Sequence, residues 1–255
     1  MPDQERLGFR TGLSGAHQAR TMMLSELETL LEMISVSSKL EAYELAVRQE
    51  NILGKATDSA RKLTFEYLKS LYGLEESLPI FRNFRRLWDL DAAARPHLAL
   101  ALALARDPGL RESWSYVAKV PVGAAVGTAS MAGWLEERHP KRWKDATRKS
   151  LAQNLNGTWT QAGYFKGKVN KVRVHPTWHP VAVTYSLFMG WLEGLRGEQL
   201  LQSTWADLWG LPVEARLDEV VAAARLGWMD VRSAGGVLEL RFEGWLHPHE
   251  ERWLA

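Results

Sequence analysis

Apolar side chains in the first half of this 255-residue chain recur at spacings of three and four residues, the period of one face of an α-helix. The first such face consists of Met23, Leu27, Leu30, Leu31 and Ile34. Because alternating strand patterns are absent between Leu13 and about Arg138, we predict that this part of the chain is entirely helical.

Capping residues and turn residues divide this part into helices. Thr57 or Asp58 supplies a side-chain oxygen that caps a helix start, and Gly73 suits the end of the same helix. We predict further helices over Gly15–Ile34, Ser37–Glu50, from Leu78-Pro79, from about Asp91, after Pro108 and over Thr128–Glu137. In the remainder of the chain we predict helices over Lys144–Asn156, Val181–Leu195, Glu198–Trp209 and Val213–Arg225. We expect Gly157 to end the first of these.

Two segments follow their helices with a pattern typical of a β-hairpin. In Tyr164–Val174, Val172 and Val174 alternate with charged residues, and Gly167 offers a turn. Near the C-terminus, two alternating runs, Trp228–Arg232 and Val237–Phe242, flank Ala234-Gly235-Gly236. Helices followed by a two-stranded hairpin are the plan of a winged helix.

These patterns predict a mainly α protein, in which an N-terminal helical bundle precedes winged-helix-like elements with one or two short β-hairpins. We divide it into an all-α domain of residues 1–138 and a second part of residues 139–255. The second part combines a basic winged-helix-like module with C-terminal helices and a hairpin.

The net charge of +2 conceals a strong asymmetry along the chain. Between Arg138 and Arg173 ten Lys and Arg residues face a single acid, Asp145, so this segment carries +9 and the other 219 residues carry −7. Such a basic segment on a mildly acidic body is typical of a protein that binds nucleic acid or another anionic surface.

The predicted elements bring these cations together. Lys144, Arg148 and Lys149 lie on the helix, and the hairpin lysines cluster at its turn, so both are placed to contact DNA phosphates. Amides of Gln153, Asn154 and Asn156 are candidates for reading base edges. The predicted nucleic-acid-binding residues are Lys141, Arg142, Lys144, Arg148, Lys149, Gln153, Lys166, Lys168, Lys171 and Arg173.

Other interpretations of the same residues stay open. The basic face suits an acidic partner subunit, which would make the protein an assembly adaptor, and it also suits simple solvation. Trp143, Trp159 and Trp178 flank the basic segment and are candidates for base stacking, although core packing explains most of the 12 tryptophans. The acidic helix Val213–Arg225 favours a packing or protein-contact role.

We find no pattern that indicates an enzyme, a cofactor or a metal. The chain has no cysteine, no phosphate-binding glycine loop and no paired carboxylates typical of a nuclease, and prolines around His175 and His179 make a zinc site improbable. The longest apolar stretch, His97–Ala105, is too short to span a membrane, and the polar N-terminus does not resemble a secretory signal. We therefore expect a cytoplasmic protein.

Several short runs between about Phe9 and His175, two-thirds of the chain, carry a family resemblance. The runs are Arg10-Thr11-Gly12-Leu13, Glu50-Asn51-Ile52-Leu53, Thr57-Asp58-Ser59-Ala60-Arg61, Ala146-Thr147-Arg148-Lys149 and Gln161-Ala162-Gly163-Tyr164-Phe165. Together they resemble the BrxA family, small helical proteins of bacteriophage-exclusion (BREX) defence systems, and none of them is a catalytic signature.

The resemblance implies a helical core related to the antitermination protein NusB, joined to winged-helix-like elements. It also implies non-enzymatic binding of double-stranded DNA, as an accessory to other subunits of the defence system. Val181–Phe242 lies beyond the resemblance, so its role is open, as is the oligomeric state. No family motif transfers DNA-contacting residues to this chain, and the site residues above depend on charge and geometry alone.

Overall fold

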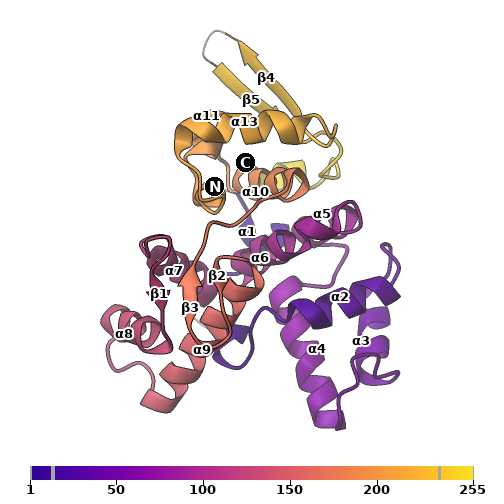
Figure 1. Cartoon of the computed structure of the whole chain (residues 1–255). Coiled ribbons are helices and arrows are strands. Elements are labelled where there is room, and N and C mark those ends of the chain that lie inside the picture. Colours follow the sequence, from indigo (N-terminus) through magenta and orange to yellow (C-terminus); the bar gives the residue numbers. More distant parts are fainter. Residues whose placement is uncertain (1, 13–14, 235–236, 255) are drawn as a thin grey trace. The chain divides into compact units, whose positions relative to one another are not determined.

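The fold is mainly helical, as the sequence predicts. The computed structural model describes residues 2–12, 15–234 and 237–254. It is 57% helix, and the described residues form 13 α-helices and two small antiparallel sheets, one of them a C-terminal hairpin (Figure 1). None of the helices in these ranges combines the length and apolar character needed to cross a membrane.

The chain forms two compact units, each assembled from discontinuous segments. Unit 1 comprises Met1–Arg10, Glu75–Ala105 and Thr177–Ala255, and unit 2 comprises Thr11–Leu74 and Arg106–Pro176. The domain boundary predicted between residues 138 and 139 falls inside unit 2 and stays a prediction.

The N-terminal helices of unit 2 are shorter than the apolar period suggests. A 3-10 helix (Ala16–Gln18) precedes α2 (Leu24–Met33), because Met23 adopts a left-handed backbone conformation that no continuous helix accommodates. Next come α3 (Leu40–Arg48) and α4 (Asp58–Tyr72). The predicted cap is confirmed, since the Thr57 side chain accepts a hydrogen bond from the Ala60 N–H.

The second half of unit 2 has the element order of a winged helix. A helix, α7 (Pro108–Val117), leads through strand β1 (Ala125–Val126) to α8 (Thr128–Arg138) and α9 (Asp145–Gln161). Strands β2 (Phe165–Lys166) and β3 (Lys171–Arg173) follow, and β3 lies between β1 and β2 in the sheet (Figure 1). The pairs Ala125–Val172 and Phe165–Arg173 set the antiparallel register. We call Pro108–Arg173 the basic module and the β2–β3 hairpin its wing.

Two features of the basic module correct the sequence prediction. Strand β1 interrupts the part expected to be entirely helical, and its two residues are too few for an alternating pattern. Gly157, expected to end the helix, lies inside α9. A β-carbon there would come within 2.8 Å of the Thr21 methyl group, so close packing against the preceding segment explains this glycine.

Unit 1 contains mostly buried apolar helices. Helix α10 (Pro180–Leu192) is buried nearly all round, and its Phe188 packs against Phe242 and Trp245. Ser203 caps a new helix, so the predicted helix Glu198–Trp209 is instead α11 (Glu198–Leu201) and α12 (Thr204–Asp207). The other α-helices are α1 (Gln4–Leu7), α5 (Pro79–Leu87), α6 (Arg95–Arg106, whose last residue belongs to unit 2) and α13 (Val213–Ala224), and the 3-10 helices are Ala92–Ala94 and Glu251–Leu254.

The C-terminal hairpin is confirmed, with strands β4 (Asp230–Ala234) and β5 (Val237–Arg241). Their pairing runs from Asp230–Arg241 to Ala234–Val237. The predicted turn at Gly235 and Gly236 lies outside the described residues. Leu238 and Leu240 are buried while Val237, Glu239 and Arg241 are exposed, which is the alternation that the sequence predicts.

Candidate nucleic-acid interface

Helix α9 presents one apolar face and one polar face within the basic module. Leu151, Leu155 and Trp159 are buried, and α9 packs against α8 and β2. Lys149 and Gln153, four residues apart on the opposite face, are exposed. Helix α9 therefore exposes a polar, partly basic surface on the side away from α8 and β2.

A buried polar network holds α9 against the segment that precedes α2. The His17 Nδ1–H donates to Asp107 Oδ2 at 2.7 Å, and His17 Nε2 lies 2.8 Å from Thr158 Oγ1 on α9. Thr158 Oγ1 also accepts a hydrogen bond from the Met22 N–H at 2.8 Å. Asp107 in turn caps α7 through the Leu110 N–H, so one network joins three parts of unit 2.

The charge state of Asp107 follows from these contacts. Burial alone raises the pKa of a carboxyl group, but the charge and hydrogen bonds of His17, with the Leu110 N–H, outweigh burial and lower the pKa of Asp107 to about 2. The ionised carboxylate is therefore part of the folded structure. No sequence pattern signals this network, because His17 and Thr158 are 141 residues apart.

An aromatic cluster supports the sheet of the basic module. Trp159 and Tyr164 contact each other edge to face at 4.9 Å between ring centroids, and both contact Trp114. The Trp159 Nε1–H donates to Ser113 Oγ at 2.9 Å. Trp159 is therefore a core residue and not a base-stacking platform.

The exposed cations of the interface lie at the start of α9 and on the wing. Lys141, Arg142, Lys144 and Lys149 are exposed along the α8–α9 turn and the first turns of α9, and Arg142 lies over the Trp143 ring at 4.8 Å. Lys166 and Lys168 are exposed on the wing. Within the described residues, no carboxylate comes within ion-pair distance of Lys144, Lys149, Lys166 or Lys168.

The wing turn is tight and projects an apolar side chain. Gly167 has a φ of +113°, and a β-carbon there would lie 2.1 Å from the Asn170 carbonyl oxygen, so only glycine fits. Lys168 and Val169 follow, and Val169 is 86% exposed. This geometry places Lys168 at the tip of the wing.

Arg148 and Arg138 are engaged with acids of their own module. Arg148 forms ion pairs with Glu136 on α8 and with Asp145. Arg138 Nε donates to Glu112 Oε1 at 2.8 Å, and His139 Nε2 lies 2.7 Å from the other oxygen of Glu112. These contacts fasten the end of α8, and they leave Arg148 less available to phosphate than the sequence suggests.

Lys171 and Arg173 also have structural roles. Lys171 Nζ donates to Thr160 Oγ1 at 2.8 Å and to the Gly167 carbonyl oxygen, and partial burial lowers its pKa. Arg173 is buried, and it donates to the carbonyl oxygens of Tyr164 and Val174 while lying over the Tyr164 ring. Burial lowers the pKa of Arg173 despite the nearby Tyr164. Both side chains connect the wing to its support.

Of the three amides expected to read bases, Gln153 alone is exposed. Asn154 Nδ2 donates to the His17 carbonyl oxygen, and the buried Asn156 donates to the Gly127 carbonyl oxygen. Both therefore act inside unit 2. Trp178 is likewise buried, stacked on His97 in unit 1, and Trp143 is half-buried beside Arg142.

The two histidines with metal-ligand spacing lie in different units. His179 Nδ1 pairs with Asp91 in unit 1, whereas His175 is an exposed residue of unit 2. In the ranges that the structure describes, no group of three His, Asp or Glu side chains is arranged to hold a metal ion.

No protein-family model matches the chain, and no curated protein matches it significantly in sequence. The resemblance to the BrxA family therefore stays a prediction, and the interface is defined by its geometry alone.

Proposed function

We propose that this protein binds duplex DNA without catalysing a reaction on it, using the exposed face of α9 and the wing. The observation that carries the proposal is the pairing of an uncapped, basic helix start with a basic wing in one winged-helix-like module. Among the described residues no side chain caps the α9 N-terminus, so its first N–H groups and Lys144 would attract a phosphate, while Asp145 in the first turn is paired with Arg148.

The spacing of the cations suits a duplex. Lys171 joins the wing to Thr160, eleven residues after Lys149 on α9. At 1.5 Å per residue, these positions are about 16 Å apart along the helix. The major groove is about 12 Å wide, so this separation would let Lys149 and the wing contact phosphates on its two sides, with Gln153 between them near the bases.

The biological setting follows from the resemblance to the BrxA family. Under this proposal the protein is an accessory of a bacterial phage-defence system, and it holds DNA near other subunits. A second function, an adaptor that docks its basic face on an acidic partner subunit, uses the same side chains. The DNA-binding function requires the isolated chain to bind DNA, whereas the adaptor function does not.

The test is a triple charge reversal, K149E/K166E/K168E, measured by fluorescence anisotropy with a labelled duplex. We expect affinity to fall on the order of 100-fold, because three phosphate contacts become repulsive. The matched control K39E/K62E/R252E changes the net charge equally at exposed positions outside the interface and should retain wild-type affinity.

The same assay distinguishes the alternatives. Single-stranded DNA and RNA of the same sequence should bind more weakly than the duplex. Equal losses in the two triple variants would show that general charge, and not this interface, attracts DNA. If the wild-type protein bound none of the three nucleic acids, the result would contradict the proposal and favour the adaptor function.

A further inference from the structure

Helix α13 in unit 1 exposes a continuous apolar stripe. Val213, Leu217 and Val221 recur every four residues and are 41%, 39% and 42% exposed. The adjacent face of the helix, about 90° away around the axis, carries the buried Val220 and Ala223 and packs against α10. The apolar surface of α13 is therefore broad, and among the described residues only the part that faces α10 is buried.

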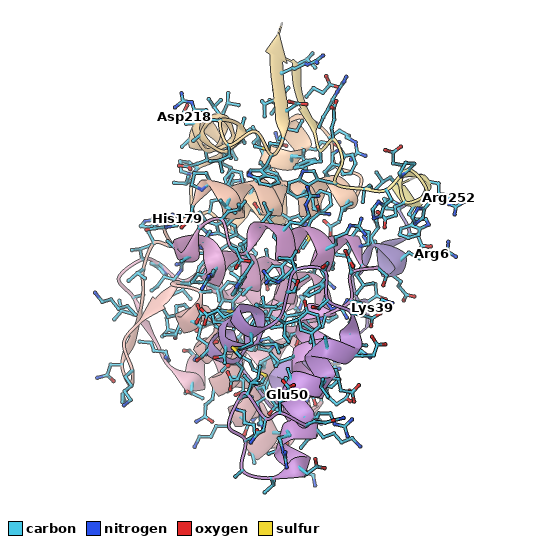
Figure 2. All side chains as sticks on the ribbon, turned by 90° about the vertical axis from the view of Figure 1, so that its right-hand side faces the viewer. Arg6, Lys39, Glu50, His179, Asp218 and Arg252 are labelled. Carbon is cyan, nitrogen blue, oxygen red and sulfur yellow. The ribbon has the colours of Figure 1, made fainter. Side chains whose placement is uncertain are left out.

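Charged side chains line one flank of this stripe, and along the helix the acids come before the base. At 100° per residue, Glu214, Asp218 and Arg225 fall within about 40° of one another around the helix axis, beside the stripe. The two acids lie in the first half of α13, and Arg225 follows its last residue. All three are exposed, and none forms an ion pair with another described residue (Figure 2 labels Asp218).

We propose that the stripe is covered by the same helix of a second copy of this chain, packed antiparallel. A two-fold axis perpendicular to both helices reverses the direction of α13 but keeps its charged flank on the same side of the pair. With the axis near Glu219, Leu217 contacts Val221 of the second copy, and Arg225 faces Glu214. A parallel pair would place the two charged flanks on opposite sides.

Charge complementarity is the reason to choose a second copy as the partner. Antiparallel self-packing pairs Arg225 of each copy with Glu214 of the other, while the Asp218 carboxylates lie near the two-fold axis at the exposed edge of the pair. Three side chains per helix make a small interface, so we expect a weak dimer that forms reversibly as the concentration rises. This inference does not depend on DNA binding, because the stripe and the basic module use different residues.

The test is sedimentation velocity of the full chain over about 5 to 300 μM. We expect a concentration-dependent dimer, and L217E/V221E should remain monomeric because it places carboxylates in an apolar interface. The control L45E/L63E changes two other exposed leucines to glutamate and should associate like wild type. Circular dichroism checks that both variants are folded.

A charge swap tests the antiparallel register. R225E should raise the dimer dissociation constant by about tenfold, because it places acids opposite each other, and E214R/R225E should restore it. A wild-type chain that is monomeric throughout the range would overturn the proposal. So would association that L217E/V221E leaves unchanged, or a charge swap that fails to restore binding.

Discussion

The basic module and the C-terminal module, Val213–Arg241, both end in a hairpin but differ in what they expose. Twelve Lys and Arg against four acids give the basic module a net charge of +8, whereas four against five give the C-terminal module −1. The first exposes lysines on its helix and wing, and the second exposes an apolar stripe. Two modules that both end in a hairpin therefore expose different surfaces, one basic and one apolar.

The two modules also differ in what holds them together. In the basic module, the buried His17–Asp107–Thr158 network joins α9 to the preceding segment. The C-terminal hairpin instead buries Leu238 and Leu240. The stability of a polar network depends on the charge state of its members, whereas that of an apolar contact does not. A fall in pH should therefore weaken the buried network but not the packing of the C-terminal hairpin.

Asp107→Asn should have a large effect on stability that depends on pH. Removing one partner of a buried ion pair costs about 3 kcal/mol of unfolding free energy at pH 7, measured by urea denaturation. Asp107 has a pKa of about 2 in the folded chain against an ordinary 3.8, so its contribution is present above about pH 4 and is lost as the pH falls towards 2. The difference between wild type and variant should shrink over that range.

Leu240→Ala is the matched control in the C-terminal module. It should also cost about 3 kcal/mol, through a cavity, but its cost should not change between pH 5 and pH 3. A pH-independent cost of Asp107→Asn would show that the buried network is not held by an ionised carboxylate.

Arg173→Ala and Lys168→Ala should distinguish a residue that stabilises the wing from one that contacts DNA. Because Arg173 is buried against Tyr164, its removal should lower the unfolding free energy by about 2 kcal/mol. Lys168→Ala should leave stability within about 0.5 kcal/mol of wild type but weaken duplex binding. Thermal unfolding and anisotropy measured on both variants test this division. If Arg173→Ala weakened duplex binding without lowering stability, Arg173 would belong to the DNA interface.

Gln153→Ala should have a smaller effect, confined to sequence preference. If the amide reads a base, the variant loses about 1 kcal/mol on the preferred duplex and nothing on others. Selection from a randomised duplex pool, repeated with the variant, measures this difference. Identical selected sequences would show that binding depends on phosphate contacts alone.

Arg232→Glu should have no effect on DNA affinity, although Arg232 is an exposed cation on a hairpin like Lys168. The surrounding C-terminal module lacks the excess of positive charge that attracts phosphate. Anisotropy under the conditions used for Lys168→Ala tests the comparison. A loss equal to that of Lys168→Ala would extend the interface to both modules.

Much of the fold was predictable because it depends on local patterns. The Thr57 cap, the apolar faces of the helices and the alternation of Leu238 and Leu240 all act between near neighbours in sequence. The prediction that Gly157 ends its helix was wrong because this glycine packs against Thr21, 136 residues away. Strand β1 was missed because it acquires its partner, β3, only in the folded chain.

The candidate interface was predictable in outline but not in detail. Charge counting located the segment, yet it cannot distinguish an exposed lysine such as Lys149 from Arg148, which pairs with Glu136, or from the buried Arg173. That distinction depends on tertiary contacts. The structure thereby shows which residues of the candidate interface are exposed, namely several of its cations and Gln153.

The salt dependence of duplex binding tests the central claim most directly. For wild type we expect the logarithm of affinity to fall linearly with the logarithm of salt concentration. In K149A/K166A/K168A the slope should be smaller by about 2.7, because each lost phosphate contact removes about 0.9. A slope equal to that of wild type would show that these lysines do not touch DNA and would contradict the account.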